Sequence, residues 1–186
     1  MIVSFSGSPG SGKSGIAERL AKELGWPYYD IGMLRRRLAG ERGMTLEEYN
    51  TLGESDPSTD LEVDNYQKDL GTKEDNFIIT GRTSWYFIPH SFKIYLFTDM
   101  SIGAERIFND VKNRNEAAPF KNIEDVIKAL KRRIASDDLR YKKYFNIEVN
   151  DLSNYDWVLD TGILDKEEAF RSVKERVVQE MENRDN

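Results

Sequence analysis

The sequence contains no cysteine and a single histidine, His90. It therefore forms no disulfide, offers no thiolate to a metal and has no histidine-rich metal centre. No uninterrupted apolar run approaches the roughly 18 residues that a membrane-spanning helix needs. The N-terminus also lacks the basic and then apolar pattern of a secretory signal. These absences predict a cytoplasmic protein that does not bind membranes.

Positive charge is in deficit, because 27 lysines and arginines face 33 aspartates and glutamates, which gives a formal net charge of −6. Binding to a nucleic-acid polymer depends on a broadly basic surface, so we expect none here. The arginines are nevertheless clustered, at 35–37, at 132–133 and at 140, with Arg82 between these groups. Basic patches on an acidic protein favour a small phosphorylated ligand. A solvated helix face is the alternative for each basic run.

The chain of 186 residues is 39% hydrophobic, which predicts one compact domain. Short apolar runs predict strands, and longer periodic segments between them predict helices. The expected strands are 2–5, 26–30, 77–79, 92–97 and 157–159, and the expected helices are 13–24, one from about 102, 123 to about 144, and 166–181. This alternation predicts a parallel sheet covered by helices on both faces. Residues 33–71 have few apolar side chains, and we expect an inserted helical subdomain there rather than core.

Between the first expected strand and the first expected helix lies GSPGSGKS, residues 7–14. It matches G-x-x-x-x-G-K-[ST], in which glycines let the backbone turn its N–H groups toward a phosphate chain. The helix that begins near Lys13 directs its positive N-terminus at the same anion. Lys13 adds a cation for the β- and γ-phosphates, and the Ser14 hydroxyl can bind Mg²⁺. The sequence therefore predicts a nucleoside triphosphate site at this turn.

This motif alone does not define a reaction. The D-x-x-G and N-K-x-D patterns of GTPases do not occur in the sequence, and nucleic-acid motors are generally larger. Phosphoryl transfer to a small acceptor requires a second cluster of positive charge. Arg36 and Arg82 each follow an expected strand, and Arg133, Asp137 and Arg140 share one face of the long helix. An exposed Arg–Asp pair is the alternative for that helical triplet.

Several segments, taken in order, resemble the nucleoside monophosphate kinases, and most closely the short archaeal-type branch of the cytidylate kinases. The segments are GSPGSGKSGIAERLAKELGWPYYDIG, RRRLAGERGMTLEEYN, DPSTDLEVDNYQKDL, FIITGR and RRIASDDLRYKKYFNIEVNDLSNYDWVLDT. The resemblance covers nearly the whole chain and is loosest at 85–91 and 109–122. It implies the P-loop α/β fold, a three-layer αβα sandwich with a five-stranded parallel sheet. The implied core is 1–31, 75–112 and 123–186, with a nucleotide-binding insert at about 32–74 and a lid at about 113–122.

The resemblance also implies that ATP is the phosphoryl donor, Mg²⁺ the cofactor, and a monomer the working form. The implied ATP-binding residues are those of the phosphate loop, namely Gly7, Ser8, Pro9, Gly10, Ser11, Gly12, Lys13, Ser14 and Gly15. Ser14 is the implied metal ligand, and residues 160–163 would border the adenine. Small-molecule nucleotides are then the only partners that we expect.

For the acceptor, the resemblance implies that Arg36 and Arg82 grip the monophosphate. Asp137 would hold the acceptor nucleotide or orient Arg140. Lys13, Arg133 and Arg140 are the implied catalytic residues, where the two arginines stabilise the transferring phosphoryl group. Two further arginines are expected behind them, Arg106 and Arg114.

Two departures from the family pattern bear on this interpretation. Thr80 stands where many relatives carry an acid that orders the Mg²⁺ shell, and Asp30 is expected to substitute for that acid or to orient the acceptor. The aromatic run 85–87 is expected to narrow or reshape the base pocket. The leading hypothesis is direct in-line phosphorylation of CMP or dCMP to the diphosphate. A kinase for another small acceptor, and a nucleotide-binding protein with weakened catalysis, remain as alternatives.

Overall fold

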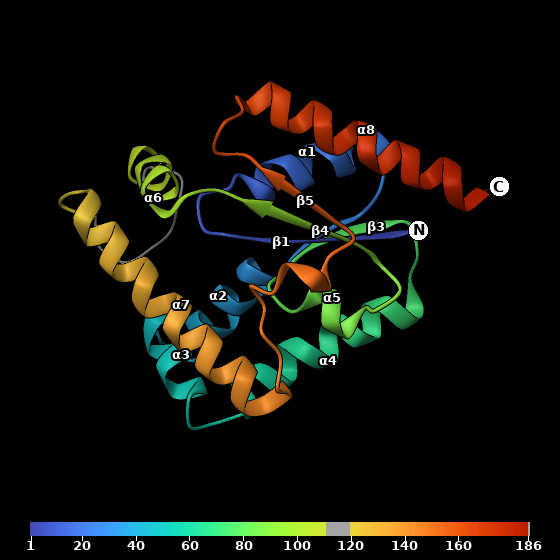
Figure 1. Ribbon diagram of the computed structural model, residues 1–186. Coiled ribbons are helices and arrows are strands. Elements are labelled where there is room, and N and C mark those ends of the chain that lie inside the picture. Colours follow the sequence, from blue (N-terminus) through green and yellow to red (C-terminus); the bar gives the residue numbers. More distant parts are fainter. Residues whose placement is uncertain (111–119, 186) are drawn as a thin grey trace.

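A parallel β-sheet forms the centre of the molecule. The computed structural model describes residues 1–110 and 120–185, and over these residues the sheet has five strands in the order β2-β3-β1-β4-β5 (Figure 1). The strands are β1 (Ile2–Gly7), β2 (Tyr28–Asp30), β3 (Phe77–Thr80), β4 (Phe92–Phe97) and β5 (Trp157–Asp160). All neighbouring strands pair in parallel. The predicted sheet is therefore confirmed.

Helices cover both faces of the sheet, as the alternation of elements predicts. They are α1 (Lys13–Leu24), α2 (Ile31–Glu41), α3 (Leu46–Gly53), α4 (Ser58–Lys73), α5 (Ser84–Phe87), α6 (Met100–Asn109), α7 (Ile123–Phe145) and α8 (Lys166–Asp185). A short 3₁₀ turn spans Leu152–Asn154. α1 and α8 lie on one face, and α2, α4 and α5 lie on the other (Figure 1). The result is the three-layer αβα sandwich that the sequence predicts.

Side chains of β1 alternate between two hydrophobic clusters, which explains why this strand is buried on both faces. Val3 and Phe5 pack into the cluster with α1 and α8, whereas Ile2 belongs to the cluster on the opposite face. β1 is the central strand because it pairs with both β3 and β4. The carboxyl ends of β1, β3 and β2 therefore meet at one edge of the sheet, which is where parallel α/β folds place their ligands.

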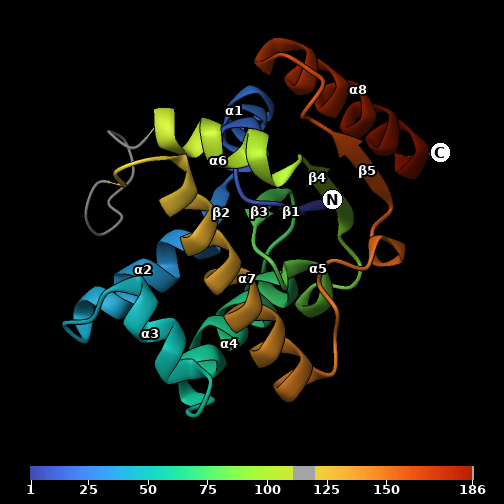
Figure 2. The same cartoon turned by 60° about the vertical axis from the view of Figure 1, so that its left-hand side comes forward.

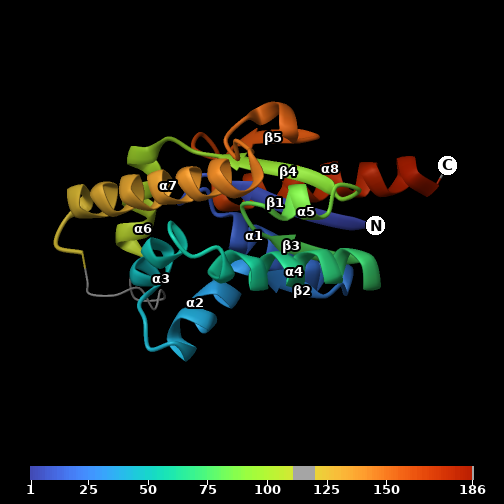
Figure 3. The same ribbon diagram turned by 90° about the horizontal axis from the view of Figure 1, so that it is seen from below.

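The helices that follow β2 contribute to the hydrophobic core, whereas the sequence predicts an inserted subdomain outside the core. Leu38, Tyr49, Val63 and Leu70 are buried and belong to one cluster with Ile79 of β3. The apolar residues in this stretch are few, but they turn toward the sheet, and composition alone does not reveal their common direction. α4 in particular belongs to the helical layer below the sheet in Figure 1, and in Figure 3 it runs along the sheet near β3.

Gly10 of the loop after β1 touches α6 so closely that a side chain has no room. It has φ +76°, and a Cβ there would lie 2.3 Å from the carbonyl oxygen of Gly103. We predict that Gly10→Ala lowers the free energy of unfolding by about 1–3 kcal/mol through strain and overpacking. Gly40→Ala in α2, where nothing lies within 4 Å, is the matched control. It should raise that free energy by about 0.5–1 kcal/mol.

Urea denaturation of the two variants beside the parent protein measures both changes. Equal stabilities for the two alanine variants would contradict this account of the loop.

Candidate active site

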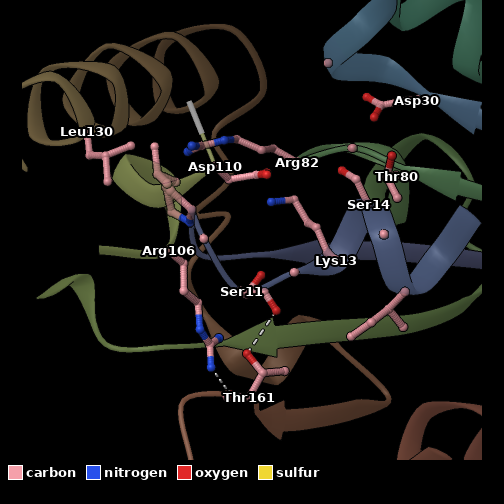
Figure 4. Close-up of a pocket in the computed structure, with 18 of the residues that line it drawn as sticks. Ser11, Lys13, Ser14, Asp30, Thr80, Arg82, Arg106, Asp110, Leu130 and Thr161 are labelled. Atoms are coloured by element: carbon pink, nitrogen blue, oxygen red, sulfur yellow. Dashed lines mark hydrogen bonds between the residues drawn. The ribbon is translucent and has the colours of Figure 1, made fainter. Parts of the chain in front are cut away.

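A cavity of about 720 Å³ opens at the carboxyl ends of β1, β2 and β3. Cationic side chains from several elements line it, so its electrostatic character is that of an anion site. The cationic residues are Lys13, Arg19, Arg35, Arg36, Arg82, Arg106, Arg133 and Lys166. Figure 4 shows Lys13, Arg82 and Arg106 around this space, contributed by α1, the turn after β3 and α6.

The loop from Gly7 to Lys13 forms the floor of the cavity. Gly12 is in the left-handed conformation, at φ 82°, and it starts α1 without any side-chain cap. The first N–H groups of α1 are therefore left for a bound anion. The Ser8 hydroxyl fixes the loop to the end of β4, because it donates to the carbonyl of Thr98 at 3.1 Å and accepts from the N–H of Thr98 at 2.8 Å.

Lys13 extends from the start of α1 into the cavity, in the direction of Asp110 and Arg82 (Figure 4). The next residue, Ser14, is exposed and directs its hydroxyl toward Thr80. Both side chains thus face the space that the loop encloses. These are the positions that a phosphate-binding lysine and a metal-binding hydroxyl require.

The ends of β2 and β3 carry a connected set of oxygen atoms. Asp30 is the register partner of Thr80, so its carboxylate stands one strand away from that hydroxyl. The Tyr28 hydroxyl donates to Oδ2 of Asp30 at 3.3 Å and lies 3.1 Å from the Thr80 hydroxyl. Burial raises the pKa of Tyr28, with a smaller contribution from Asp30. The phenol therefore stays protonated and keeps its role as a donor.

The segment after β5 is fixed to the phosphate loop by one threonine. The Thr161 hydroxyl donates to the carbonyl oxygens of Ser11 and Phe97, each at 3.0 Å. Arg106 of α6 donates to the backbone carbonyl of Thr161 at 2.9 Å (Figure 4). Thr161 and Arg106 both line the cavity, and the hydrogen bond to Ser11 places Thr161 beside the phosphate loop.

Behind the cavity wall, one carboxylate of α4 binds arginines of two other helices. Oδ1 of Asp60, in α4, accepts from Nη1 of Arg35 in α2 at 2.6 Å and from Nη1 of Arg140 in α7 at 2.5 Å. Asp60 is 3% exposed, Arg35 is 8% exposed and Arg140 is 0% exposed. Buried charges are tolerated only when each has a partner. The spacing of α2, α4 and α7 is therefore set by these contacts.

A second carboxylate continues the chain of charges to the cavity. Asp137 of α7 accepts from Arg140 and also from Nη1 of Arg82 at 2.9 Å. Burial alone would raise the pKa of Asp137, but the guanidinium groups of Arg82, Arg133 and Arg140 lower it overall. The carboxylate is therefore ionised, and it orients Arg82 at the cavity wall. We refer to Arg35, Asp60, Arg140, Asp137 and Arg82 as the buried charge chain.

Arg140 does not occupy the position that the sequence predicts. It is fully buried between Asp60 and Asp137 and is not among the residues that line the cavity. Arg133 and Asp137 do line it. The helical spacing correctly places the three residues on one side of α7, but it does not reveal their depth, which the packing of α7 against α4 decides.

Arg35 is a cavity residue that the sequence analysis does not single out. It is buried, whereas its neighbour Arg36 is more exposed, and both line the cavity. The signal that could have found it is periodicity. Ile31, Arg35 and Leu38 lie at i, i+4 and i+7 on the buried side of α2.

The aromatic run 85–87 does not narrow the cavity, which corrects another expectation. Trp85 packs against Tyr155 with 5.7 Å between ring centroids, and Phe87 packs edge-on against Phe145 at 5.3 Å. None of the three aromatic residues of the run lines the cavity. They instead join α5 to the end of α7 and to the segment before β5.

Part of the expected lid lies outside the described residues, as does Arg114, because 111–119 are not among them. From the described part, Asn122 begins α7 by accepting a hydrogen bond from the N–H of Asp125 at 2.9 Å.

This fold, with a phosphate loop between its first strand and its first helix, is that of the P-loop proteins. Shikimate kinase from Bacteroides thetaiotaomicron has a similar structure, with a TM-score of 0.63 at 13% identity over 98% of each chain. An uncharacterized protein from Eubacterium ventriosum has a TM-score of 0.69 at 15% identity, again over 98% of each chain. At such low identity these likenesses concern the fold alone.

The sequence comparisons are more specific. The model of the cytidylate kinase-like family matches residues 2–163, and the chain belongs to this family. A cytidylate kinase from Methanocella arvoryzae is 42% identical over 162 residues, which are 87% of this chain and 88% of that protein. Another from Methanothrix thermoacetophila is 39% identical over 166 residues, or 89% and 91% of the two chains. The resemblance stated from the sequence motifs is confirmed.

Within the described residues, we find no helix that is both long enough and apolar enough to span a bilayer.

Asp64 lies one helical turn after Asp60 on α4 and is 3% exposed. Burial raises the pKa of its carboxyl from an ordinary 3.8 to about 7, and the adjacent charge of Asp60 adds to the effect. The folded protein then binds more protons than the unfolded chain between these two pH values. This carboxyl therefore favours the folded state most below about pH 4, and the contribution is lost as the pH rises to about 7.

Asp64→Asn replaces the protonated carboxyl with a neutral isostere. It should therefore remove the loss of stability that the parent protein shows as the pH rises. We predict that the variant gains stability relative to the parent between pH 5 and pH 8, by on the order of 1–3 kcal/mol. Urea denaturation of both proteins at pH 5 and pH 8 measures this difference in the free energy of unfolding. The exposed Asp69→Asn variant is the control and should keep the parental pH profile. A parental profile in Asp64→Asn as well would refute the raised pKa.

Proposed function

We propose that the protein is an ATP-dependent kinase that phosphorylates CMP or dCMP to the corresponding diphosphate. One observation carries the proposal. A single cavity joins the phosphate loop around Lys13 to a second set of cations, Arg36 and Arg82, which a second phosphorylated substrate would require. The cytidine preference rests on the family and on the curated relatives, which are named cytidylate kinases.

In this proposal the two substrates occupy opposite parts of the cavity. The phosphate loop, Gly7 to Gly15, holds the ATP phosphates, and residues 160–163 border the adenine. Arg36 and Arg82 grip the acceptor phosphate, because the planar guanidinium fixes both its charge and its orientation. The ion pair from Asp137 keeps Arg82 in place for this role.

The reaction is a direct in-line displacement. An oxygen of the acceptor 5′-phosphate attacks the γ-phosphorus of ATP, the bond from that phosphorus to the β–γ bridging oxygen breaks, and ADP leaves. Lys13 and Arg133 stabilise the negative charge on the transferring group, with Arg106 behind them. Arg140 acts on the acceptor site through Asp137 and not by touching the phosphoryl group, since it is buried.

The oxygen atoms at the strand ends fit Mg²⁺. Ser14, Asp30 and Asp110 line the same cavity, and Mg²⁺ in kinases is held by few protein oxygens together with substrate phosphates and water. The bound ion would neutralise charge on the β- and γ-phosphates. We propose Ser14 as a ligand and Asp30 as the carboxylate that orders the surrounding water, in place of the acid missing at Thr80.

The proposal extends to the working form of the enzyme. Residues 32–74 serve as the nucleotide-binding insert, and the segment 113–122 serves as the lid. In this proposal the working form is a monomer that acts on small-molecule nucleotides in the cytoplasm.

The first experiment measures turnover of ATP with CMP, dCMP, UMP, AMP and shikimate in a coupled assay. CMP or dCMP should give the highest kcat/KM. Lys13→Ala should lower kcat with CMP by about 10²-fold or more, because it removes a charge at the transferring group. Lys22→Ala, an exposed lysine at the far end of α1, should leave kcat unchanged. Turnover with shikimate and none with any nucleotide would support the alternative of another small acceptor.

A second experiment concerns the metal. Asp30→Asn should raise the Mg²⁺ concentration needed for half-maximal turnover by about tenfold or more, because groups that order a metal shell change its affinity by about 10–100-fold. Asp69→Asn, far from the cavity on α4, is the charge-matched control. An unchanged Mg²⁺ dependence in Asp30→Asn would mean that this carboxylate has no part in the metal shell.

A further inference from the structure

Asn50 of α3 is a buried polar residue outside the phosphate loop and outside the proposed arginine clamp. It is 6% exposed and lines the cavity together with Leu46, one helical turn before it. α3 lies against α7 (Figures 2 and 3), and the Tyr144 hydroxyl fixes the contact by donating to the carbonyl of Gly53 at 2.8 Å. Asn50 is therefore held on a rigid part of the wall.

The orientation of the Asn50 amide is determined by its neighbour. Nε of Arg35 donates to Oδ1 of Asn50 at 2.7 Å. A guanidinium has donors only, so the amide oxygen and not the nitrogen has to face it. Arg35 is itself fixed by Asp60 and by the carbonyl of Thr59 at 3.4 Å. The buried charge chain thus prevents the amide from turning over.

This arrangement leaves the amide nitrogen as the available group. Among the described residues, Nδ2 of Asn50 donates to no acceptor in the folded chain. A donor at the cavity wall that is not used within the chain can donate to a ligand that brings an acceptor, and its fixed orientation makes that hydrogen bond selective. Asn50 is bonded to Arg35, which is adjacent in sequence to Arg36 of the proposed phosphate clamp, so we assign the ligand group that it meets to the acceptor nucleotide.

We propose that Asn50 determines base specificity by donating from Nδ2 to the neighbouring acceptors O2 and N3 of cytosine. This inference rests on the proposed function and assigns the base contact to a residue. Uracil carries a hydrogen on N3, so its N–H opposes the amide N–H and UMP is disfavoured. A site that holds a fixed donor rejects a base with a donor at the same place, because neither group is then satisfied.

Asn50→Asp tests the inference with an isosteric change. The carboxylate can still accept from Arg35, but it now presents an oxygen where the parent protein presents an N–H. The ratio of kcat/KM for CMP to that for UMP should fall by about tenfold or more, the size of one base-edge contact. The KM for ATP should stay unchanged. Asn183→Asp on the exposed end of α8 makes the same chemical change far away and should keep the parental ratio.

A second measurement uses the parent protein, so that it does not depend on the folding of a variant. 3-Deaza-CMP lacks the N3 acceptor and should lose about tenfold or more in kcat/KM relative to CMP. In Asn50→Ser this penalty should shrink. Equal kcat/KM for the two substrates in the parent protein, or an unchanged CMP-to-UMP ratio in Asn50→Asp, would overturn the role of Asn50. Absence of activity with every nucleotide in the parent protein would instead overturn the proposed function.

Discussion

The carboxylate of Asp60 is the contact on which the geometry of the cavity depends. It accepts hydrogen bonds from arginines of α2 and α7 in the protein interior, where a charge without a partner is strongly destabilising. The same two arginines extend the influence of Asp60 to the cavity wall. Arg35 fixes the amide of Asn50, and Arg140 holds Asp137 against Arg82. The buried charges of Asp60 and Arg140 thus fix the positions of side chains at the cavity wall that they do not themselves form.

The parallel sheet positions the other side of the cavity. Its central strands end together, so the phosphate loop after β1 and the oxygen atoms of Asp30 and Thr80 lie at one edge. The sheet thereby holds the side of the cavity that contains the phosphate loop. The side around Arg35, Arg82 and Asp137 is held by helices joined through ion pairs. Hydrophobic burial stabilises the side formed by the sheet, and charge pairing stabilises the side formed by the helices.

The sequence predicts the sheet, its helices and the phosphate loop because these depend on local patterns, such as the apolar run before Gly7 and the glycines after it. It also predicts that Arg36, Arg82 and Arg133 belong to one site. It does not predict the depth of Arg140, which depends on a carboxylate 80 residues earlier in the chain. The aromatic run at 85–87 is misread for the same reason, since its partners Phe145 and Tyr155 come from distant segments. Contacts between distant segments leave no local pattern.

That separation in sequence has a consequence for biosynthesis. The ribosome completes α2, α3 and α4 well before Arg140 of α7 emerges, so Asp60 first exists with only one of its two arginines. The buried charge chain is therefore complete only once α7 has been made. The phosphate loop and β1 are thus made early, whereas the contact that fixes Arg82 at the cavity wall forms only after Asp137 of α7 has been made.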